Sequence, residues 1–217
     1  MKLENPPRKP YVARGSNIER CDGCRLPIEA CICEWRSTVR ASCEFWLLTH
    51  RYERYKPTNT GQLILDTIGH SRIFEWSRTE PEQALLDMLQ DSRYFPCLVF
   101  PSGEDYQHRM VSRLPEDGRT PAFIILDGTW RQARRMFRHS RYLQHLPVIE
   151  PETDRLSRYQ LRRSTVKEHL CTAEVAVALL EQVGDQAAAE HLEEYFERFN
   201  AGYIASRRRW CKNGSGE

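Results

Sequence analysis

Short apolar runs alternate with amphipathic segments along most of the chain. Apolar runs of strand length occupy residues 42–50, 72–76, 96–100, 121–128 and 147–150. Apolar residues recur at helical spacing in residues 61–69, 80–90, 130–143, 172–184 and 186–208. Strands that alternate with helices are typical of parallel pairing, because each parallel crossover needs a connection of helical length. The pattern therefore predicts an α/β fold class, a mostly parallel sheet with flanking helices.

Two of the predicted helices carry start signals. Thr79 with Glu82, and Thr129 with Gln132, have the spacing of a capping box, in which each side chain bonds the other residue's backbone N–H. We therefore expect helices to begin near residues 80 and 130. The run FIIL within 121–128 is apolar at every position. A strand covered on both faces has this pattern, which predicts a central place in the sheet.

Composition divides the chain into four stretches. We expect an extended, Pro-rich arm at 1–20, a four-cysteine module at 21–40, an α/β catalytic domain at 41–208 and a tail at 209–217. No apolar run approaches the length of about 18 residues that indicates a membrane span. The first residues lack the apolar core of a secretory signal. We expect a cytoplasmic protein with no membrane partner, and no protein partner is implied.

Four of the eight cysteines form the compact motif Cys21-x2-Cys24-x6-Cys31-x-Cys33. Four thiolates around one point satisfy tetrahedral Zn²⁺ and leave no open coordination position, so the spacing predicts a structural zinc site. Free thiols and an iron–sulfur cluster are the alternatives. Three further cysteines in apolar surroundings are expected to be buried: Cys43, Cys97 and Cys171.

The distribution of charge is more informative than the net charge of +2. Of the 32 basic residues 27 are Arg, which forms bidentate hydrogen bonds with phosphate. No acidic residue occurs in 128–149, so a basic helix face there calls for an external anion, and we predict that it binds RNA. Salt bridges to the acidic residues of 181–197 are the alternative. The RNA-binding candidates are Arg131, Arg134, Arg135 and Arg138.

Asp127 is the candidate catalytic carboxylate. It directly follows the apolar residues FIIL within 121–128 and precedes the helix predicted from Trp130. Ligands of open α/β sheets bind at the carboxyl ends of the strands, which favours a functional role. The alternatives are a carboxylate that only stabilises the helix start, and a Trp130 that only fills the core. The helix N-terminus is expected to lower the pKa of Asp127.

Several segments together resemble the DTW-domain family. They are DGTW at 127–130 followed by RQARRM, the four-cysteine motif, LLTH at 47–50, PTNTG at 57–61, LVFPS at 98–102 and LCTAEVAVALLE at 170–181. The chain is similar to the bacterial tRNA-uridine aminocarboxypropyltransferases. The family commonly has S-T-x-E-A before its C-terminal helix, where this chain has Cys171 in place of Ser and keeps Thr172 and Glu174.

The resemblance implies an activity and a fold. Such enzymes transfer the 3-amino-3-carboxypropyl group of S-adenosylmethionine to N3 of a uridine in tRNA, at position 47 of the variable loop in bacteria, and release methylthioadenosine. S-adenosylmethionine and tRNA are the implied partners. The family is related to the SPOUT class, which implies a C-terminal backbone knot. Two other functions stay open: a SPOUT-like RNA methyltransferase, and a non-catalytic RNA-binding module that contains zinc.

The same resemblance implies roles for site residues. Asp127 is expected to act as the general base that takes the uridine proton, or to orient the substrate. Trp130 is expected to stack on a base, and Asn59-Thr60-Gly61 to hold the methionine carboxylate at a helix start. The implied cofactor-binding set is Asn59, Thr60, Gly61, Pro101, Ser102, Gly103, Thr129, Trp130, Leu170, Thr172 and Glu174.

Overall fold

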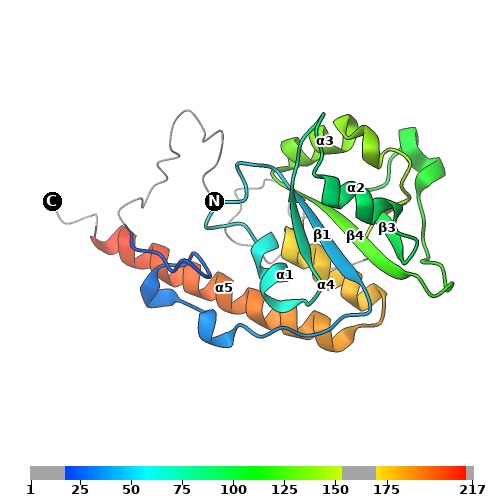
Figure 1. Ribbon diagram of the computed structural model, residues 1–217. Coiled ribbons are helices and arrows are strands. Elements are labelled where there is room, and N and C mark those ends of the chain that lie inside the picture. The colour runs from blue at the N-terminus through cyan, green and yellow to red at the C-terminus, as the bar shows by residue number, and fades with distance from the viewer. Residues whose placement is uncertain (1–17, 153–169, 214–217) are drawn as a thin grey trace.

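A five-stranded parallel sheet forms the centre of the computed structural model, which describes residues 18–152 and 170–213 (Figure 1). The strand order is β2-β1-β4-β3-β5, and every adjacent pair is parallel. This confirms the predicted fold class. The strands are β1 (Glu44–Thr49), β2 (Arg72–Glu75), β3 (Tyr94–Val99), β4 (Thr120–Asp127) and β5 (Val148–Ile149).

Strand β4 lies at the centre of the sheet. It pairs with β1 on one side and with β3 on the other. Phe123 and Ile125 pack into one apolar cluster, whereas Ile124 and Leu126 pack into the cluster on the opposite face. Alternate residues of a strand point to opposite faces, so a strand covered on both sides must be apolar at every position. The predicted central place of this segment is confirmed.

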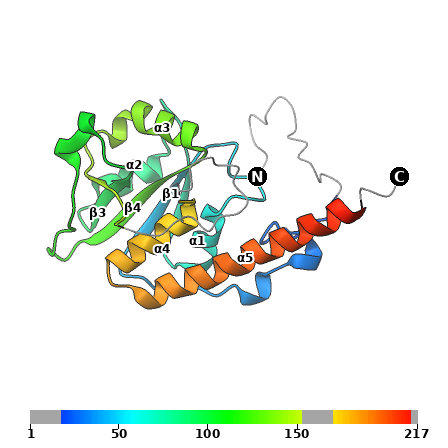
Figure 2. The same ribbon diagram turned by 180° about the vertical axis from the view of Figure 1, so that it is seen from behind.

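Helices cover both faces of the sheet (Figure 2). Residues of α1, α4 and α5 share an apolar cluster with one face, and residues of α2 and α3 share a second cluster with the other face. The fold is therefore a three-layer α/β/α arrangement. The helices are α1 (Gly61–Thr67), α2 (Gln83–Gln90), α3 (Trp130–His139), α4 (Thr172–Gln182) and α5 (Gln186–Asn213).

The four-cysteine segment packs against α5 and contains the short 3-10 helices η1 (Ile28–Ala30) and η2 (Cys33–Trp35). Leu26 and Ile32 are buried in the same cluster as α1, α4 and α5. Gly202 of α5 lies so close that a Cβ there would stand 3.2 Å from the carbonyl oxygen of Ala30. The segment thus shares its apolar core with the α/β domain, alongside α5 in Figure 1.

The predicted boundaries differ most from the structure at three helices. Helix α2 begins at Gln83, and the predicted capping box of Thr79 is wrong, because the Glu82 carboxylate instead accepts a hydrogen bond from the backbone N–H of Glu75 at 2.6 Å. The helix predicted over 130–143 ends at His139, and the short 3-10 helix η4 (Arg141–Leu143) follows it. Helix α5 continues to Asn213 instead of ending at residue 208.

Two predictions concern residues that the structure does not describe. The C-terminal knot stays a prediction, because residues 153–169, between β5 and α4, lie outside the described residues. Most of the predicted arm, residues 1–17, lies outside them as well.

Between β3 and β4, the connection over 100–119 contains the 3-10 helix η3 (Glu104–Arg109). Among the described helices, none has the length and apolar character needed to cross a membrane.

Candidate active site at the carboxyl edge of the sheet

Two polar side chains end the two central strands. Asp127 is the last residue of β4, and its register partner Thr49 is the last residue of β1. Both continue the alternation that directs Phe123 and Ile125 toward the α1 and α4 layer. The parallel pairing therefore brings a carboxylate and a hydroxyl to the same edge and the same face of the sheet.

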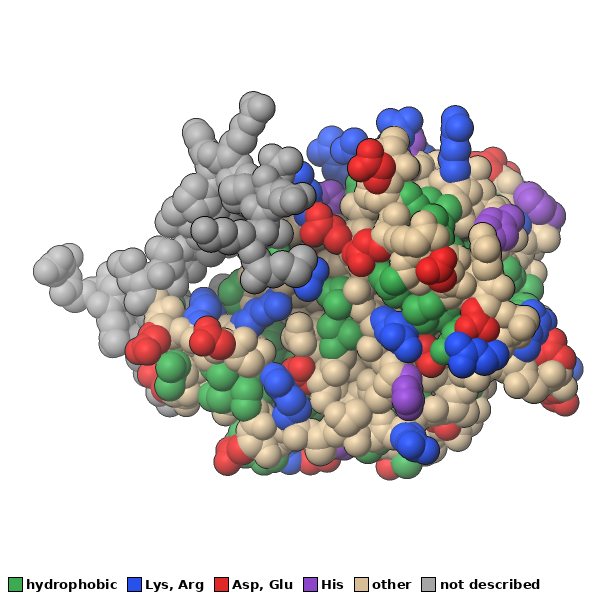
Figure 3. Space-filling view, viewed as in Figure 1, with side chains coloured by type: hydrophobic (Ala, Val, Ile, Leu, Met, Phe, Trp, Pro, Cys, Tyr) green, Lys and Arg blue, Asp and Glu red, His purple; other side chains and the backbone are tan. Residues whose placement is uncertain are grey.

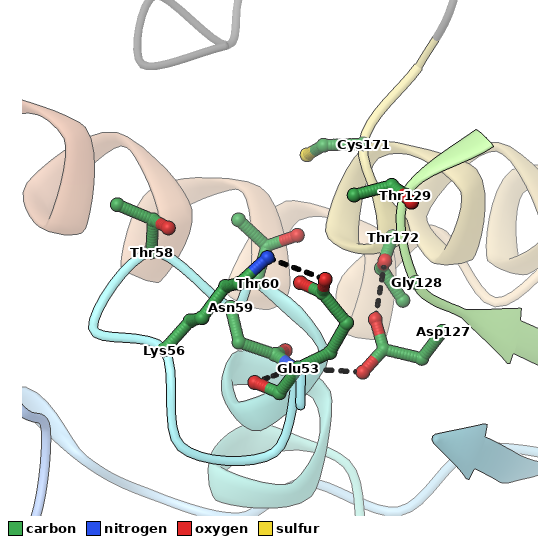
Figure 4. Close-up of a pocket in the computed structure, with 10 residues that line it drawn as sticks. All are labelled: Glu53, Lys56, Thr58, Asn59, Thr60, Asp127, Gly128, Thr129, Cys171 and Thr172. Carbon is green, nitrogen blue, oxygen red and sulfur yellow. Dashed lines mark hydrogen bonds and ion pairs between the residues drawn. The ribbon is translucent and has the colours of Figure 1, made fainter. Parts of the chain in front are cut away.

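The Asp127 carboxylate is enclosed by hydrogen-bond donors from three segments. Figure 4 shows two of them, Asn59 and Thr172. One oxygen, Oδ2, accepts from Asn59 Nδ2 at 2.7 Å and from Thr49 Oγ1 at 3.2 Å. The other, Oδ1, accepts from Thr172 Oγ1 at 2.9 Å. Asp127 is only 4% exposed. Strand β1, the loop before α1 and the start of α4 thus meet on one carboxyl group.

The loop before α1 is held against this carboxylate by its own hydrogen bonds. Asn59 also donates to the backbone oxygen of Glu53 at 3.1 Å, and its Oδ1 accepts from the N–H of Gly61 at 2.7 Å. A Cβ at Gly61 would lie 3.2 Å from Asp127 Oδ2 and 3.0 Å from Asn59 Oδ1. A side chain at this position would crowd the carboxylate and the Asn59 amide, so glycine favours their close approach.

The start of α4 completes the site. The backbone N–H of Cys171, the residue that caps α4, donates to the Glu174 carboxylate at 2.7 Å. The N–H of Ala173 donates to Thr60 Oγ1 at 3.4 Å. Leu170 comes directly before this cap and is half-buried. Glu174 thus fixes the helix start, which presents the Thr172 hydroxyl to Asp127.

A pocket of about 150 Å³ opens between these segments. Its charged walls are Asp127 and the ion pair of Glu53 and Lys56, whose carboxylate and ammonium lie 2.5 Å apart. Figure 4 shows the polar side chains from both sides directed into it. The lining residues are Glu53, Lys56, Thr58, Asn59, Thr60, Asp127, Gly128, Thr129, Cys171 and Thr172.

Burial raises the pKa of the Asp127 carboxyl above its ordinary value. The hydrogen bonds from Asn59 and Thr172 oppose this shift, and the nearby negative charge of Glu53 adds to it. The expected lowering of this pKa by the helix N-terminus is therefore wrong. The physical reason is that removal of water from a charged group outweighs the effect of the helix dipole.

Asp127 does not take the role of a helix cap. Thr129 caps α3, and the predicted capping box with Gln132 is confirmed: Gln132 Oε1 accepts from the N–H of Thr129 at 2.7 Å, and Thr129 Oγ1 accepts from the N–H of Gln132. The side-chain donors to Asp127 belong to β1, the loop before α1 and α4. The cap of α3 is therefore Thr129, and Asp127 bonds segments other than α3.

Trp130 and the turn Pro101–Gly103 lie outside the pocket lining. Trp130 stacks on Phe100, with ring centroids 5.4 Å apart, and packs against the α2 and α3 cluster. The N–H of Ser102 donates to Glu150 Oε2 at 2.9 Å, and the Tyr106 hydroxyl donates to the oxygen of Pro101. A Cβ at Gly103 would meet the Tyr106 ring at 2.7 Å. The turn follows β3 at the same sheet edge, one strand away from Asp127.

The sequence analysis assigned no site residue in the first part of the loop between β1 and α1, residues 50–56. His50 bonds Gln132 through Nδ1 at 3.1 Å and stacks on Trp76, and burial lowers its pKa. Glu53 and Lys56 line the pocket. Tyr52 is 50% exposed. The sequence HRYERYK at 50–56 could have indicated these residues, because it places charged and aromatic side chains directly after an apolar strand, at the carboxyl end of the sheet.

The basic face of α3 lies on the layer away from α5. All four of its predicted RNA-binding arginines are exposed or half-buried at the surface: Arg131, Arg134, Arg135 and Arg138. Figure 3 shows basic side chains gathered over α3. Arg134 lies over the Trp130 ring, 5.1 Å from its centroid. Because α5 covers the opposite face of the sheet, its acidic residues do not neutralise this surface.

The four cysteine sulfurs converge on one point. All four lie within 4.8 Å of one another, and individual pairs are 3.4 to 3.8 Å apart. Sulfurs that each lie about 2.3 Å from a shared tetrahedral ion are separated by about 3.8 Å. A Cβ at Gly23 would lie 2.8 Å from Cys33 Sγ, and Arg25 has a φ of 61°, so the turn is tight. The cluster is compatible with a zinc module.

Comparisons with known proteins agree with this arrangement. One curated relative, named tRNA-uridine aminocarboxypropyltransferase 2, from Macaca fascicularis, is 23% identical over 168 residues. The match covers 75% of this chain and 56% of that protein, so the chain spans about half the relative's length. No solved structure matches.

The family comparison covers more of the chain. A family model described as the DTW domain matches residues 18–204. The match includes the four-cysteine segment, the parallel sheet, the pocket around Asp127 and most of α5. The chain therefore belongs to the DTW-domain family.

Proposed function

We propose that the protein is a tRNA-modifying transferase that moves the 3-amino-3-carboxypropyl group of S-adenosylmethionine to N3 of a uridine, at position 47 of the variable loop. The observation that carries the proposal is the buried Asp127 carboxylate in a polar pocket at the carboxyl edge of the sheet. The family membership and the name of the relative support the reaction class.

Asp127 is the proposed general base. Uridine N3 is a weak nucleophile until its proton leaves, and burial raises the pKa of Asp127 toward the range in which a carboxylate accepts that proton. The N3–carbon bond forms as the carbon–sulfur bond breaks. The N3 proton passes to Asp127, and the electron pair of the broken bond stays on sulfur, which leaves as the neutral thioether methylthioadenosine.

The remaining predicted residues have supporting roles in this proposal. Asn59, Thr60 and Gly61, with Thr129, Thr172 and Glu174, shape or line the pocket for S-adenosylmethionine. Pro101–Gly103, Leu170 and Trp130 stand at the surrounding edge, where the adenosine moiety is proposed to lie. The Arg face of α3 binds the tRNA backbone, and Cys21, Cys24, Cys31 and Cys33 hold a structural zinc.

The first prediction concerns the products. With unmodified tRNA and S-adenosylmethionine, the protein is expected to form methylthioadenosine and an aminocarboxypropyl uridine, detected by mass analysis of nucleosides. A SPOUT-like methyltransferase would instead give S-adenosylhomocysteine and a methylated nucleoside. A non-catalytic RNA-binding module would give neither product. Each of the three functions therefore has its own outcome.

The second prediction concerns Asp127→Asn. Turnover is expected to fall by about 10²-fold or more, the usual scale for a general base, while tRNA affinity stays nearly unchanged. In the unaltered protein kcat/KM should rise with pH, because the base must be ionised, along a limb above the ordinary pKa of an aspartate. The limb should vanish in the variant. Asp117→Asn, at an exposed turn, is the control, and near-normal turnover of Asp127→Asn would contradict the role.

The third prediction concerns the metal. Elemental analysis is expected to find one zinc per chain, and Cys21→Ser or Cys31→Ser should lose it. These variants should also melt at a lower temperature, because the segment shares the core through Leu26. Cys97→Ala, in the centre of the sheet, is the control that should retain zinc. A metal-free protein that is folded and active would refute the assignment.

The fourth prediction concerns the double variant Arg134→Glu with Arg138→Glu, one helical turn apart on α3. The slope of log K for tRNA against log salt should fall by about 0.7–0.9 for each arginine–phosphate ion pair that the substitutions remove. S-adenosylmethionine affinity should not change. The control is the double variant Arg40→Glu with Arg119→Glu, which makes the same change in charge. These two residues precede β1 and β4, at the amino edge of the sheet. Equal slopes for the two double variants would show that α3 is not the tRNA face.

A further inference from the structure

The pocket beside Asp127 has a specific pattern of charge. Among its lining residues, three have acidic or basic side chains: Glu53 and Asp127 are acidic and Lys56 is basic. Burial raises the pKa of the Cys171 thiol, so that side chain is neutral. The lining therefore combines two carboxyl groups with one amino group, and the amino group is paired with Glu53.

S-adenosylmethionine has the complementary pattern. Its amino-acid end carries an ammonium and a carboxylate, and the adjacent sulfonium carries a positive charge. The ligand therefore has two cationic groups and one anionic group, where the pocket has two acidic side chains and one basic side chain. The inference rests on the proposed function, because that function makes this molecule the ligand.

The size of the pocket restricts which end of the ligand enters it. Cavities that enclose drug-sized ligands are about 300–1,000 Å³. A volume of about 150 Å³ lies below this range and suits the amino-acid end better than the whole molecule. That end is the group to be transferred, so its binding position determines which carbon faces the uridine.

The ion pair itself is accessible enough to bind a ligand. The side chain of Lys56 is 30% exposed and that of Glu53 is 11% exposed. An ammonium has three donors and a carboxylate about four acceptor sites, so their mutual hydrogen bond leaves capacity on both. Asp127 differs, because its oxygens already accept from Thr49, Asn59 and Thr172.

We propose that Lys56 binds the α-carboxylate and Glu53 the α-ammonium of S-adenosylmethionine, so that this pair selects a zwitterionic amino-acid end and orients it beside Asp127. This assignment moves the carboxylate contact from the backbone of Asn59–Gly61 to a side-chain ammonium. With the α-carboxylate and the α-ammonium both held, the aminocarboxypropyl chain is fixed in an orientation that presents it to the acceptor.

The test uses binding in the absence of tRNA. Calorimetry compares S-adenosylmethionine with decarboxylated S-adenosylmethionine, which keeps the sulfonium and the ammonium. The unaltered protein is expected to lose about 10- to 100-fold in affinity when the carboxylate is absent, the scale of one charge-assisted hydrogen bond. Lys56→Met should bind the two ligands within about threefold of each other, and Lys56→Arg should restore part of the difference.

Two further variants make the test specific. Arg51→Met removes the same charge from an exposed position of the same loop and should keep the full discrimination. Glu53→Gln should lose discrimination against the deaminated analogue, in which a keto group replaces the ammonium. Unchanged discrimination in Lys56→Met overturns the inference while leaving the proposed function intact. Failure of the unaltered protein to bind S-adenosylmethionine at all overturns both.

Discussion

A carboxylate without bulk water at the edge of a parallel sheet must be surrounded by hydrogen-bond donors, since burying an unpaired charge is very unfavourable. For Asp127 the donors are Thr49, Asn59 and Thr172, which lie 78, 68 and 45 positions away from it in the sequence. The arrangement of the site follows from this requirement. Strand β1 must end in register with β4, the loop before α1 must fold back over the edge, and α4 must begin there.

The same carboxylate opposes folding at neutral pH. Its pKa is raised in the folded state, so folding favours the protonated form. The stability that this group contributes is complete below the pKa of the unfolded chain and is lost as pH rises through the folded pKa. At neutral pH the two apolar clusters on either side of the sheet offset this loss. The proposed base would thus be maintained by packing that does not take part in the chemistry.

The parts that follow from local pattern were predictable from the sequence. The apolar run of β4, the Thr129 capping box and the position of Asp127 at the strand end depend on neighbouring residues. The start of α2 was not predictable, because Glu82 bonds the backbone of Glu75. The raised pKa of Asp127 was also beyond local pattern, because it results from burial. The segments that enclose the carboxylate include Asn59 and Thr172, which are 68 and 45 positions away.

The carboxylate site and the basic surface lie on different layers of the fold. The α1, α4 and α5 layer holds the carboxylate site and the four-cysteine segment, whereas α3 carries the basic surface. A hydrogen bond links α3 to the loop that follows β1: Gln132 of α3 bonds His50. A polynucleotide on α3 would therefore reach the loop that carries Glu53 and Lys56 without crossing the sheet. In the proposed function, binding of the acceptor tRNA on the α3 layer and of the donor S-adenosylmethionine on the other layer would bring the two substrates together at Asp127, the end of the strand that both layers share.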